Sequence, residues 1–469
     1  MKPKHHDLEI LDTDPFANCK LDRKKDAMIL NRIIGNFEDG FTLAINGEWG
    51  TGKTTFIKMW QKQLEQNAYK TIYLNAWEND FVSEPLICIL GELKNVTTSS
   101  NERLMKDIIN KASVFSKKII PAVAKGLAKK HLGEEASDLI ESVATATIDV
   151  FKKEVSDYEK KRKDLIDFKT KLQELVNKEC KNKPLIFIID ELDRCRPDYA
   201  VEILEKIKHF FSVEGIVFVL SIDKNQLCSS IKGHYGSNEI NAEEYLRRFI
   251  DIEYALIEPN AEKFCNYLYD YFDFSSFMQN PERLKYSDLC HDKEMFLDAA
   301  IKLAGVKRLT LRQTEKLFAY TRLALISCEK NAYLFADLFF LMIYIKAFKT
   351  NLYTDIKNHR LTIQELSDKL NDVFAENIRL EQGNKYSQAF TSILAKLLFF
   401  YNNETLSTGN YKDLINRAEG ETQILTFDSG QIDVEKCARI ILHYQESMDT
   451  HDMKLGYLND MIDLAKLLY

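Results

Sequence analysis

Short segments rich in apolar residues recur in the first half of the chain, and each predicts a strand; Leu185–Ile189 is an unbroken apolar run. Continuous apolarity over about five residues is typical of strands covered on both faces, as in the parallel sheet of an α/β domain. We therefore predict an α/β fold with a parallel sheet. The expected strands are Phe41–Asn46, Thr71–Asn75, Leu185–Ile189, Gly215–Ser221 and Phe249–Leu256.

Helical periodicity occupies most of the remaining sequence. Residues 84–180 mix apolar and charged positions over a length that no single crossover between strands needs, so they predict a helical insertion. Beyond residue 259 the pattern has no strong strand signal. We expect a core at 1–258 that contains the insertion, a helical lid domain at 259–330 and a C-terminal helical domain at 331–469.

A glycine-rich octapeptide joins the first expected strand to an amphipathic stretch. Its sequence, Gly47-Glu48-Trp49-Gly50-Thr51-Gly52-Lys53-Thr54, fits G-x-x-x-x-G-K-[ST] at every fixed position. Glycines let successive backbone N–H groups turn toward one anion, and the following helix adds the positive end of its dipole. Lys53 is placed to reach the β- and γ-phosphates, and the Thr54 hydroxyl can join an Mg²⁺ shell. We predict a triphosphate site over Gly47–Thr55, with an ordinary glycine turn as the alternative.

Two acidic residues follow the third expected strand. A carboxylate at this point is where P-loop NTPases hold their metal ion through water, so Asp190 is our candidate for the Mg²⁺ site. Glu191 is the candidate base that orients and polarises an attacking water. The alternative is a buried strand followed by a solvated acidic turn.

The next expected strand also ends in polar residues. A side chain at this position can sense a γ-phosphate, which makes Ser221 and Asp223 candidates for the nucleotide site. Helix capping by Asp223 is the alternative, because aspartate is a favoured N-cap residue.

Composition bounds the class of protein. The chain has 469 residues, of which 45% are hydrophobic, so it is long enough for two or three domains with substantial cores. The net charge of −7 and the pI near 5.9 argue against a generally basic nucleic-acid or anionic-membrane binder. Nine cysteines, with no C-x-x-C pair, indicate neither a disulfide framework nor a zinc site and suit a reducing cytosol.

The sequence carries no targeting or membrane signal. Residues 1–11 are polar and lack the apolar core of a signal peptide. A stretch of 18 uncharged apolar residues, as a spanning helix needs, does not occur. We therefore expect a cytoplasmic protein.

The order of these elements is that of the additional-strand P-loop NTPases, and the chain resembles the KAP family of P-loop NTPases. The likeness covers residues 20–260 and rests on several joint matches. The matching stretches are Gly47–Thr54, Asn75-Ala76-Trp77-Glu78, Asp190-Glu191-Leu192-Asp193-Arg194-Cys195-Arg196-Pro197, Leu220-Ser221-Ile222-Asp223-Lys224 and Glu244-Tyr245-Leu246-Arg247-Arg248-Phe249.

The resemblance implies a function that the residues alone do not. It implies ATP as the nucleotide, Mg²⁺ as the metal, and hydrolysis coupled to conformational change or assembly. It also suggests a component of bacterial anti-phage defence, of the Qat type, that acts with operon-encoded protein partners. A nucleotide-gated scaffold or signalling switch with little hydrolysis is the alternative. A homo-oligomer is compatible with both, and nucleic acid is not indicated as a partner.

The family is also known for a pair of membrane helices between its two nucleotide motifs. In this chain the equivalent stretch, Ala112–Phe151, is rich in Lys, Asp and Glu. Each such residue costs about 2.5–3.5 kcal/mol at the centre of a bilayer on insertion scales. We therefore expect no spanning pair here.

Three arginines are candidates for completing the site. Arg247 and Arg248 resemble the position from which related ATPases project an arginine toward a neighbour's nucleotide, where it stabilises charge on the transferring phosphoryl group. Surface pairing with Glu243 and Glu244 is the alternative. Arg312, in the expected lid, is a candidate for reaching back to the nucleotide.

Overall fold

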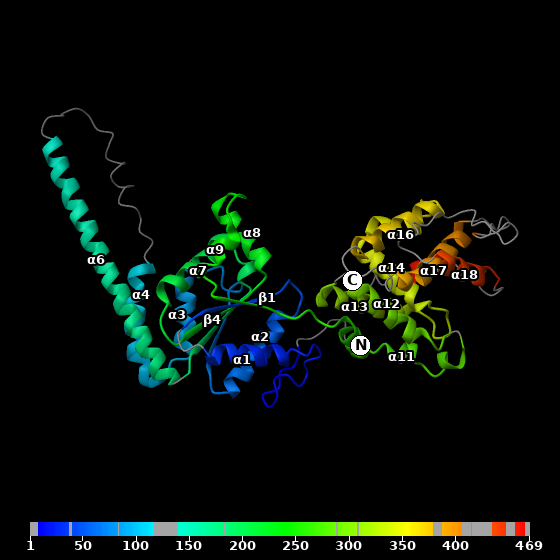
Figure 1. Cartoon of the computed structure of the whole chain (residues 1–469), viewed down its shortest axis with the longest axis horizontal. Helices are drawn as coiled ribbons and strands as arrows, with labels where there is room; N and C mark the ends of the chain where they lie inside the picture. The colour runs from blue at the N-terminus through cyan, green and yellow to red at the C-terminus, as the bar shows by residue number, and fades with distance from the viewer. Residues whose placement is uncertain are drawn as a thin grey trace. The chain divides into compact units, whose positions relative to one another are not determined.

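The computed structural model forms two compact units, Leu8–Ile257 and Glu258–Tyr469 (Figure 1). The expected boundary between residues 330 and 331, inside the second unit, stays a prediction. The structure describes residues 8–36, 40–82, 84–116, 139–181, 183–287, 289–306, 309–378, 387–405, 414, 434–446 and 455–464.

The described part of the first unit contains a five-stranded sheet in the order β2-β3-β4-β1-β5, and every neighbouring pair is parallel. The strand β4 lies between β1, which leads into the glycine-rich loop, and β3, which ends in Asp190. An interposed strand of this kind defines the additional-strand P-loop NTPases, so the predicted fold class is confirmed. The strands are β1 (Thr42–Asn46), β2 (Lys70–Asn75), β3 (Leu185–Asp190), β4 (Ile216–Ile222) and β5 (Ile252–Ala255).

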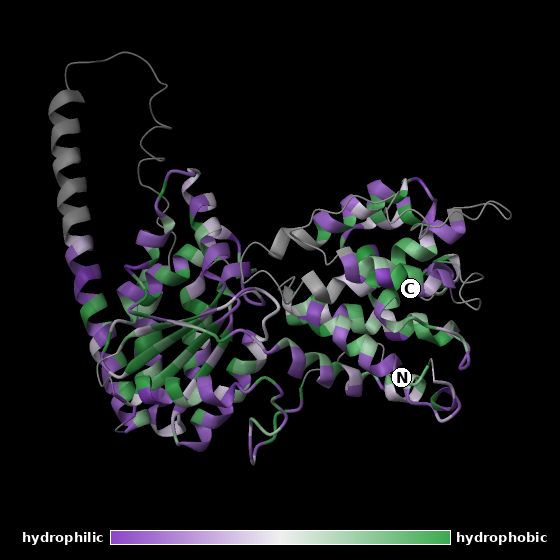
Figure 2. Cartoon of the chain, turned by 45° about the vertical axis from the view of Figure 1, so that its right-hand side comes forward, coloured by the Kyte–Doolittle hydropathy of each residue, from purple (hydrophilic) through white to green (hydrophobic). Residues whose placement is uncertain are grey.

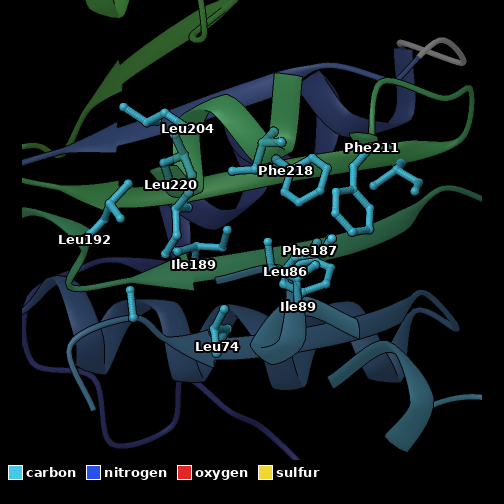
Figure 3. Packing of buried hydrophobic residues seen from close by; sticks show 14 of the residues in the cluster. Leu74, Leu86, Ile89, Phe187, Ile189, Leu192, Leu204, Phe211, Phe218 and Leu220 are labelled. Atoms are coloured by element: carbon cyan, nitrogen blue, oxygen red, sulfur yellow. The ribbon is translucent and has the colours of Figure 1, made fainter. Parts of the chain in front are cut away.

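Apolar side chains pack on both faces of the sheet, which is why its central strands are rich in apolar residues. Figure 2 colours most of the sheet as hydrophobic. Successive residues of a strand point to opposite faces. Ile186 and Ile188 pack with α1 and α2, whereas Phe187 and Ile189 pack with α3 and α7. Figure 3 shows this second core, in which the rings of Phe187 and Phe218 stack with centroids 5.3 Å apart.

The helices of the first unit begin at residues that favour helix starts. Pro85 and Pro197 occupy the first positions of α3 and α7, where the missing N–H of proline has no cost. The helices are α1 (Lys24–Asn36), α2 (Lys53–Gln66), α3 (Pro85–Asn95), η1 (Ser99–Asn101), α4 (Glu102–Ser116), α6 (Leu139–Cys180), η2 (Leu192–Arg194), α7 (Pro197–Phe210), α8 (Lys224–Tyr235) and α9 (Ala242–Leu246).

The long stretch between β2 and β3 is helical in its described part. The helices α4 and α6 pack together, and Met105, Ile108, Phe168 and Leu172 are buried in the core that they share with the sheet. The charged residues at 117–138, which argue against a membrane pair, lie outside the described residues. Among the helices that the structure describes, none has the length and apolarity needed to cross a membrane.

The second unit is helical in the residues that the structure describes. Its core contains a cluster of aromatic rings, including Phe274, Phe296, Phe318 and Phe340. The elements are α10 (Ala261–Tyr271), α11 (Ser275–Met278), η3 (Arg283–Lys285), α12 (Asp292–Val306), α13 (Leu311–Ala324), η4 (Leu325–Ser327), α14 (Ala336–Phe348), α15 (Thr350–Lys357), α16 (Ile363–Ile378), α17 (Ser387–Thr405), α18 (Val434–Glu446) and α19 (Leu455–Leu464).

Candidate functional site

The carboxyl ends of three strands bring polar residues into one row. Asn75 of β2 is in register with Asp190 of β3, and Asp190 is in register with Ser221 of β4. The glycine-rich loop leaves the end of β1, which lies beside β4. Since all strands are parallel, the loop and the row share one edge of the sheet, and this is the edge at which open α/β sheets bind ligands.

The glycine-rich loop has the backbone geometry that its sequence predicts. Gly50 and Gly52 have φ values of 81° and 82°, in the left-handed region where glycine pays no steric cost. A Cβ atom at Gly47 would lie 3.2 Å from the hydroxyl oxygen of Thr51. The buried Arg23 donates to the carbonyl oxygen of Thr51 at 3.2 Å and so restrains the loop.

Lys53 lies buried at the start of α2, beside the partly exposed Thr54 and Thr55. Its ammonium donates to the carbonyl oxygens of Gly47 and, at 3.0 Å, of Glu48. An ammonium has three N–H donors, so one is left for a phosphate oxygen. Burial lowers the pKa of Lys53, and three neighbouring aspartates oppose that shift.

Asp190 is buried at the end of β3, with both carboxylate oxygens engaged. Its Oδ2 accepts from the Tyr73 hydroxyl at 3.1 Å, and its Oδ1 accepts from the N–H of Glu191 at 3.0 Å. Burial raises the pKa of Tyr73, and the neighbouring Asp190 raises it further, so the phenol stays a donor. An ionised carboxylate offers about four lone-pair sites, which leaves Asp190 capacity for a metal-bound water.

Glu191 has a left-handed backbone, with φ 60° and ψ 27°. This region is uncommon for a residue other than glycine and costs roughly 1–3 kcal/mol, and such residues cluster at functional sites. Its Oε1 forms an ion pair with Arg194 at 2.7 Å, and its Oε2 accepts from Asn75 at 3.4 Å. Burial raises the pKa of Glu191, whereas the guanidinium of Arg194 lowers it.

The residues after Glu191 are tied to the glycine-rich loop. The indole N–H of Trp49 donates to the carboxylate of Asp193. Burial raises the pKa of Asp193, and both this hydrogen bond and the ammonium of Lys53 lower it. The guanidinium carbon of Arg194 lies 5.8 Å from the ring centroids of both Trp49 and Trp77. The loop after β1, the loop after β2 and the segment after β3 therefore form one network.

The two polar candidates at the end of β4 have different surroundings. Ser221 is fully buried, and its hydroxyl has no hydrogen-bond partner among the residues that the structure describes. Asp223 caps α8, since its carboxylate accepts from the N–H groups of Asn225 and Gln226 at 3.1 and 3.3 Å. Asp223 thus has the capping role that the sequence offered as the alternative. Contact of either residue with a γ-phosphate stays a prediction.

Two of the three arginine candidates lie at the opposite edge of the sheet. Arg247 and Arg248 follow α9 and precede β5, so they lie near the amino ends of the strands. Arg247 forms an exposed ion pair with Glu244 at 3.0 Å, and Arg248 is exposed. Arg312 is exposed on α13, in the second unit. The roles of all three toward a nucleotide stay predictions.

Asn75, Trp77 and Arg194 lie in the stretches that carry the family resemblance, but sequence reasoning gave them no role toward the nucleotide, and it did not select Tyr73. Tyr73 and Asn75 contact the acidic pair only because β2 lies beside β3, which no local pattern reveals. Arg194 follows Glu191 at a spacing of three, and that spacing was a usable sign of an ion pair. Trp77 gives no such sign, because its ring reaches Arg194 from a different loop.

The residues at this edge fit a magnesium ion that is shared with a nucleotide. In the described part of the chain, no group of three or more His, Cys, Asp or Glu side chains is arranged to hold a metal by itself. Mg²⁺ does not need such a group, because it is usually held by one or two carboxylates, several waters and the phosphates of a substrate. Asp190 and the hydroxyl of Thr54 are the donors that this arrangement offers.

Comparison with known proteins agrees with this geometry. The model of the KAP family P-loop domain matches residues 23–323, which is well over half of the chain. The chain belongs to the KAP family. Its P-loop NTPase domain contains the glycine-rich loop and the strands β1 to β5 described above, and nucleotide binding is the property expected of such a domain.

Comparisons with individual proteins add little to the family match. No curated protein matches the chain. Among solved structures, the ORC2 protein of Aeropyrum pernix, described as ADPNP and ADP complexes, is 14% identical, with a TM-score of 0.31. The match covers 96% of this chain and 95% of that one. A TM-score this low supports no argument about fold or function.

Proposed function

We propose that this KAP family protein binds ATP with Mg²⁺ at the carboxyl edge of its sheet and hydrolyses it. One observation carries the proposal: the phosphate-binding loop, a buried ammonium and an Asp-Glu pair converge on the same edge. ATP as the nucleotide follows from the resemblance to the family.

Each side chain has a role that its contacts support. Lys53, held by two loop carbonyls, binds the β- and γ-phosphate oxygens. Asp190 and Thr54 would hold the metal, which would neutralise charge on the phosphates. Glu191, fixed at both carboxylate oxygens, orients a water toward the γ-phosphate and accepts its proton.

Steady-state ATPase assays and calorimetry on the full chain test this proposal. We expect Lys53→Ala to lose ATP binding, and Glu191→Gln to bind ATP normally but turn over about 10²–10⁴-fold more slowly. Lys58→Ala is the matched control, because Lys58 is an exposed residue of the same helix. If wild type turns over no faster than Glu191→Gln while both bind ATP, the protein is a nucleotide-gated scaffold. If wild type binds no triphosphate, both functions are excluded.

An arginine supplied by a second copy of the chain is part of the proposal. Arg247 and Arg248 are exposed at the edge opposite the glycine-rich loop, so a contribution to catalysis requires another copy. A mixing assay tests this step. Lys53→Ala and the double variant Arg247→Ala/Arg248→Ala should each be inactive alone and active when mixed. Failure of the mixture to recover activity would remove the arginines from the mechanism.

The role in anti-phage defence, with operon-encoded partners, rests on family resemblance. Hydrolysis at the sheet edge would change the conformation of the helical parts or the assembly state, and the partners would respond to that change. Expression of the chain with its neighbouring genes should lower phage plaque counts, and Glu191→Gln should remove the protection. Equal plaque counts with and without the wild-type gene would argue against this role.

A further inference from the structure

We infer that Arg194 is a positioning residue for Glu191: its guanidinium, set against the two indole rings of Trp49 and Trp77, fixes the glutamate carboxylate in the orientation that water activation needs. This inference deepens the proposed hydrolysis and rests on it. It assigns a function to a residue that neither binds the phosphates nor holds the metal.

The first observation is the contact itself. The Nη1 atom of Arg194 lies 2.7 Å from Oε1 of Glu191, and the two side chains are 28% and 14% exposed. At this distance and burial the two groups form an ion pair with limited competition from water. Asn75 takes the other oxygen at 3.4 Å. The carboxylate is therefore held from two sides, by the last residue of β2 and by a residue of η2.

The second observation concerns what holds Arg194. Its guanidinium carbon is 5.8 Å from the ring centroid of Trp49 and 5.8 Å from that of Trp77. Arginine near an aromatic ring gains cation–π attraction, which restricts where the side chain can lie. Trp49 is itself tied by its indole N–H to Asp193. The orientation of Arg194 is thus set by the phosphate-binding loop and by the loop after β2.

The third observation explains why Glu191 needs such support. Its backbone is left-handed, and no glycine-like freedom lowers the cost. A glutamate side chain has three rotatable bonds, so the backbone alone does not determine where the carboxylate lies. A misplacement of about 1 Å costs an enzyme as much as 10²-fold in rate. Arg194 and Asn75 supply the missing restraint.

The geometry also predicts that lysine cannot replace this arginine. A guanidinium is planar, so it can face an aromatic ring and donate in a fixed direction at the same time. An ammonium on a flexible stem makes a point contact without that direction. A positive charge at residue 194 is therefore not sufficient for full activity. A residue that served only to balance the charge of Glu191 would tolerate replacement by lysine.

The test compares wild type, Arg194→Lys, Arg194→Gln and the control Arg196→Gln. Arg196 lies two residues further on, is 61% exposed and pairs with Asp80 at 3.8 Å, so it has the same chemistry without contact to Glu191. We expect both Arg194 variants to lower kcat about 10- to 100-fold, with KM and the Kd for ATP within twofold of wild type. Arg196→Gln should leave kcat unchanged.

A double-variant cycle distinguishes positioning from direct catalysis. If Arg194 acts through Glu191, Arg194→Gln should cause no further loss in kcat when it is added to Glu191→Gln. A further loss in that background would mean that Arg194 acts on the nucleotide itself and would overturn the inference. Full activity of Arg194→Lys, or equal losses for Arg194→Gln and Arg196→Gln, would also overturn it. A wild type without ATPase activity would instead contradict the proposed function.

Discussion

Buried charges occur in both units of the molecule, and they are compensated in different ways. In the second unit, Arg283 pairs with Asp292, and Lys396 pairs with Asp337 at 2.6 Å. All four side chains are almost completely buried. Each is a closed pair of one cation with one anion, and Arg283 also donates to two backbone carbonyl oxygens.

The carboxyl edge of the sheet has a surplus of acid instead. Asp190, Asp193 and Asp223 are buried around the ammonium of Lys53. Burial of an uncompensated carboxylate is unfavourable, and a bound cation removes that cost. The charges of a closed pair balance without a bound ion, so such a pair indicates a structural role. The open cluster has the charge balance that a divalent ion would complete, and this difference supports the proposed binding site at the sheet edge.

The largest effect should come from breaking a closed pair. Arg283→Met leaves Asp292 buried without its cation and leaves two carbonyl oxygens without a donor. We expect the free energy of unfolding to fall by about 3–5 kcal/mol, measured by urea unfolding with circular dichroism. Arg247→Met is the control, because its ion pair is exposed, and it should change stability by less than about 0.5 kcal/mol. Similar effects of the two variants would show that burial does not distinguish these pairs.

The second pair allows a test of whether charge is needed at all. Asp337→Leu or Lys396→Met alone should lower the free energy of unfolding by about 3 kcal/mol, because each leaves one buried charge unpaired. The double variant should lie within about 1 kcal/mol of wild type, since apolar residues of similar size often replace a buried pair without loss. The same urea titrations measure it. Additive losses would mean that the surroundings, and not the partner, stabilise each charge.

Local patterns in the sequence were sufficient for the sheet and the glycine-rich loop. The central strands β3 and β4 are rich in apolar residues because both of their faces are covered, and the left-handed Gly50 and Gly52 are readable from their residue type. The last strand was predicted too long: Phe249–Leu256 shortens to Ile252–Ala255 in the structure. The residues next to β5 still bond to β1, because the N–H groups of Asp251 and Leu256 donate to the carbonyl oxygens of Thr42 and Asn46 at 3.0 Å.

Contacts across strands could not be predicted in this way. Asn75 reaches Glu191 because β2 and β3 are neighbours, and the order of strands is not a local property. Arg247 was a candidate for the nucleotide, but its spacing of three from Glu244 equally fits the surface ion pair that the structure contains. Spacing along the chain was therefore sufficient to select the glycine-rich loop and the acidic pair. The residues that contact them from other strands could be found only from the folded structure.

A third prediction concerns a pair that joins the helical insertion to the sheet. Glu179, at the end of α6, accepts from Lys70 of β2 and from Thr98 and Asn101. Burial raises the pKa of Glu179, but these bonds outweigh it and lower the pKa from 4.5 to about 2. Because the folded pKa is below the unfolded one, the stabilisation is complete above pH 4.5 and is lost as the pH falls toward 2.

The variant Glu179→Gln measures this contribution. At pH 7 we expect its free energy of unfolding to be about 2–3 kcal/mol below that of wild type, from the size of the pKa shift. The difference should shrink as the pH falls below 4.5, in urea titrations at a series of pH values. Lys178→Gln is the control, since Lys178 is half-exposed and pairs only with Glu174 within α6 among the contacts described. A pH-independent difference would assign the effect to packing.

The smallest effect should be a gain in stability at the sheet edge. Asp190→Asn removes one charge from the acid surplus and can keep both contacts, because its amide oxygen can accept from the N–H of Glu191 while its NH₂ group donates to the hydroxyl oxygen of Tyr73. We expect the metal-free protein to gain about 0.5–1 kcal/mol, because the variant relieves repulsion that a cation otherwise relieves, while Mg²⁺-dependent stabilisation by ATP is lost. Thermal unfolding with EDTA, and with Mg²⁺ and ATP, measures both. Asp337→Asn, the same change inside a closed pair, should only destabilise. If Asp190→Asn destabilises the metal-free protein as Asp337→Asn does, then Asp190 also belongs to a closed structural pair. The contrast between the open acidic cluster and the closed pairs would then be wrong.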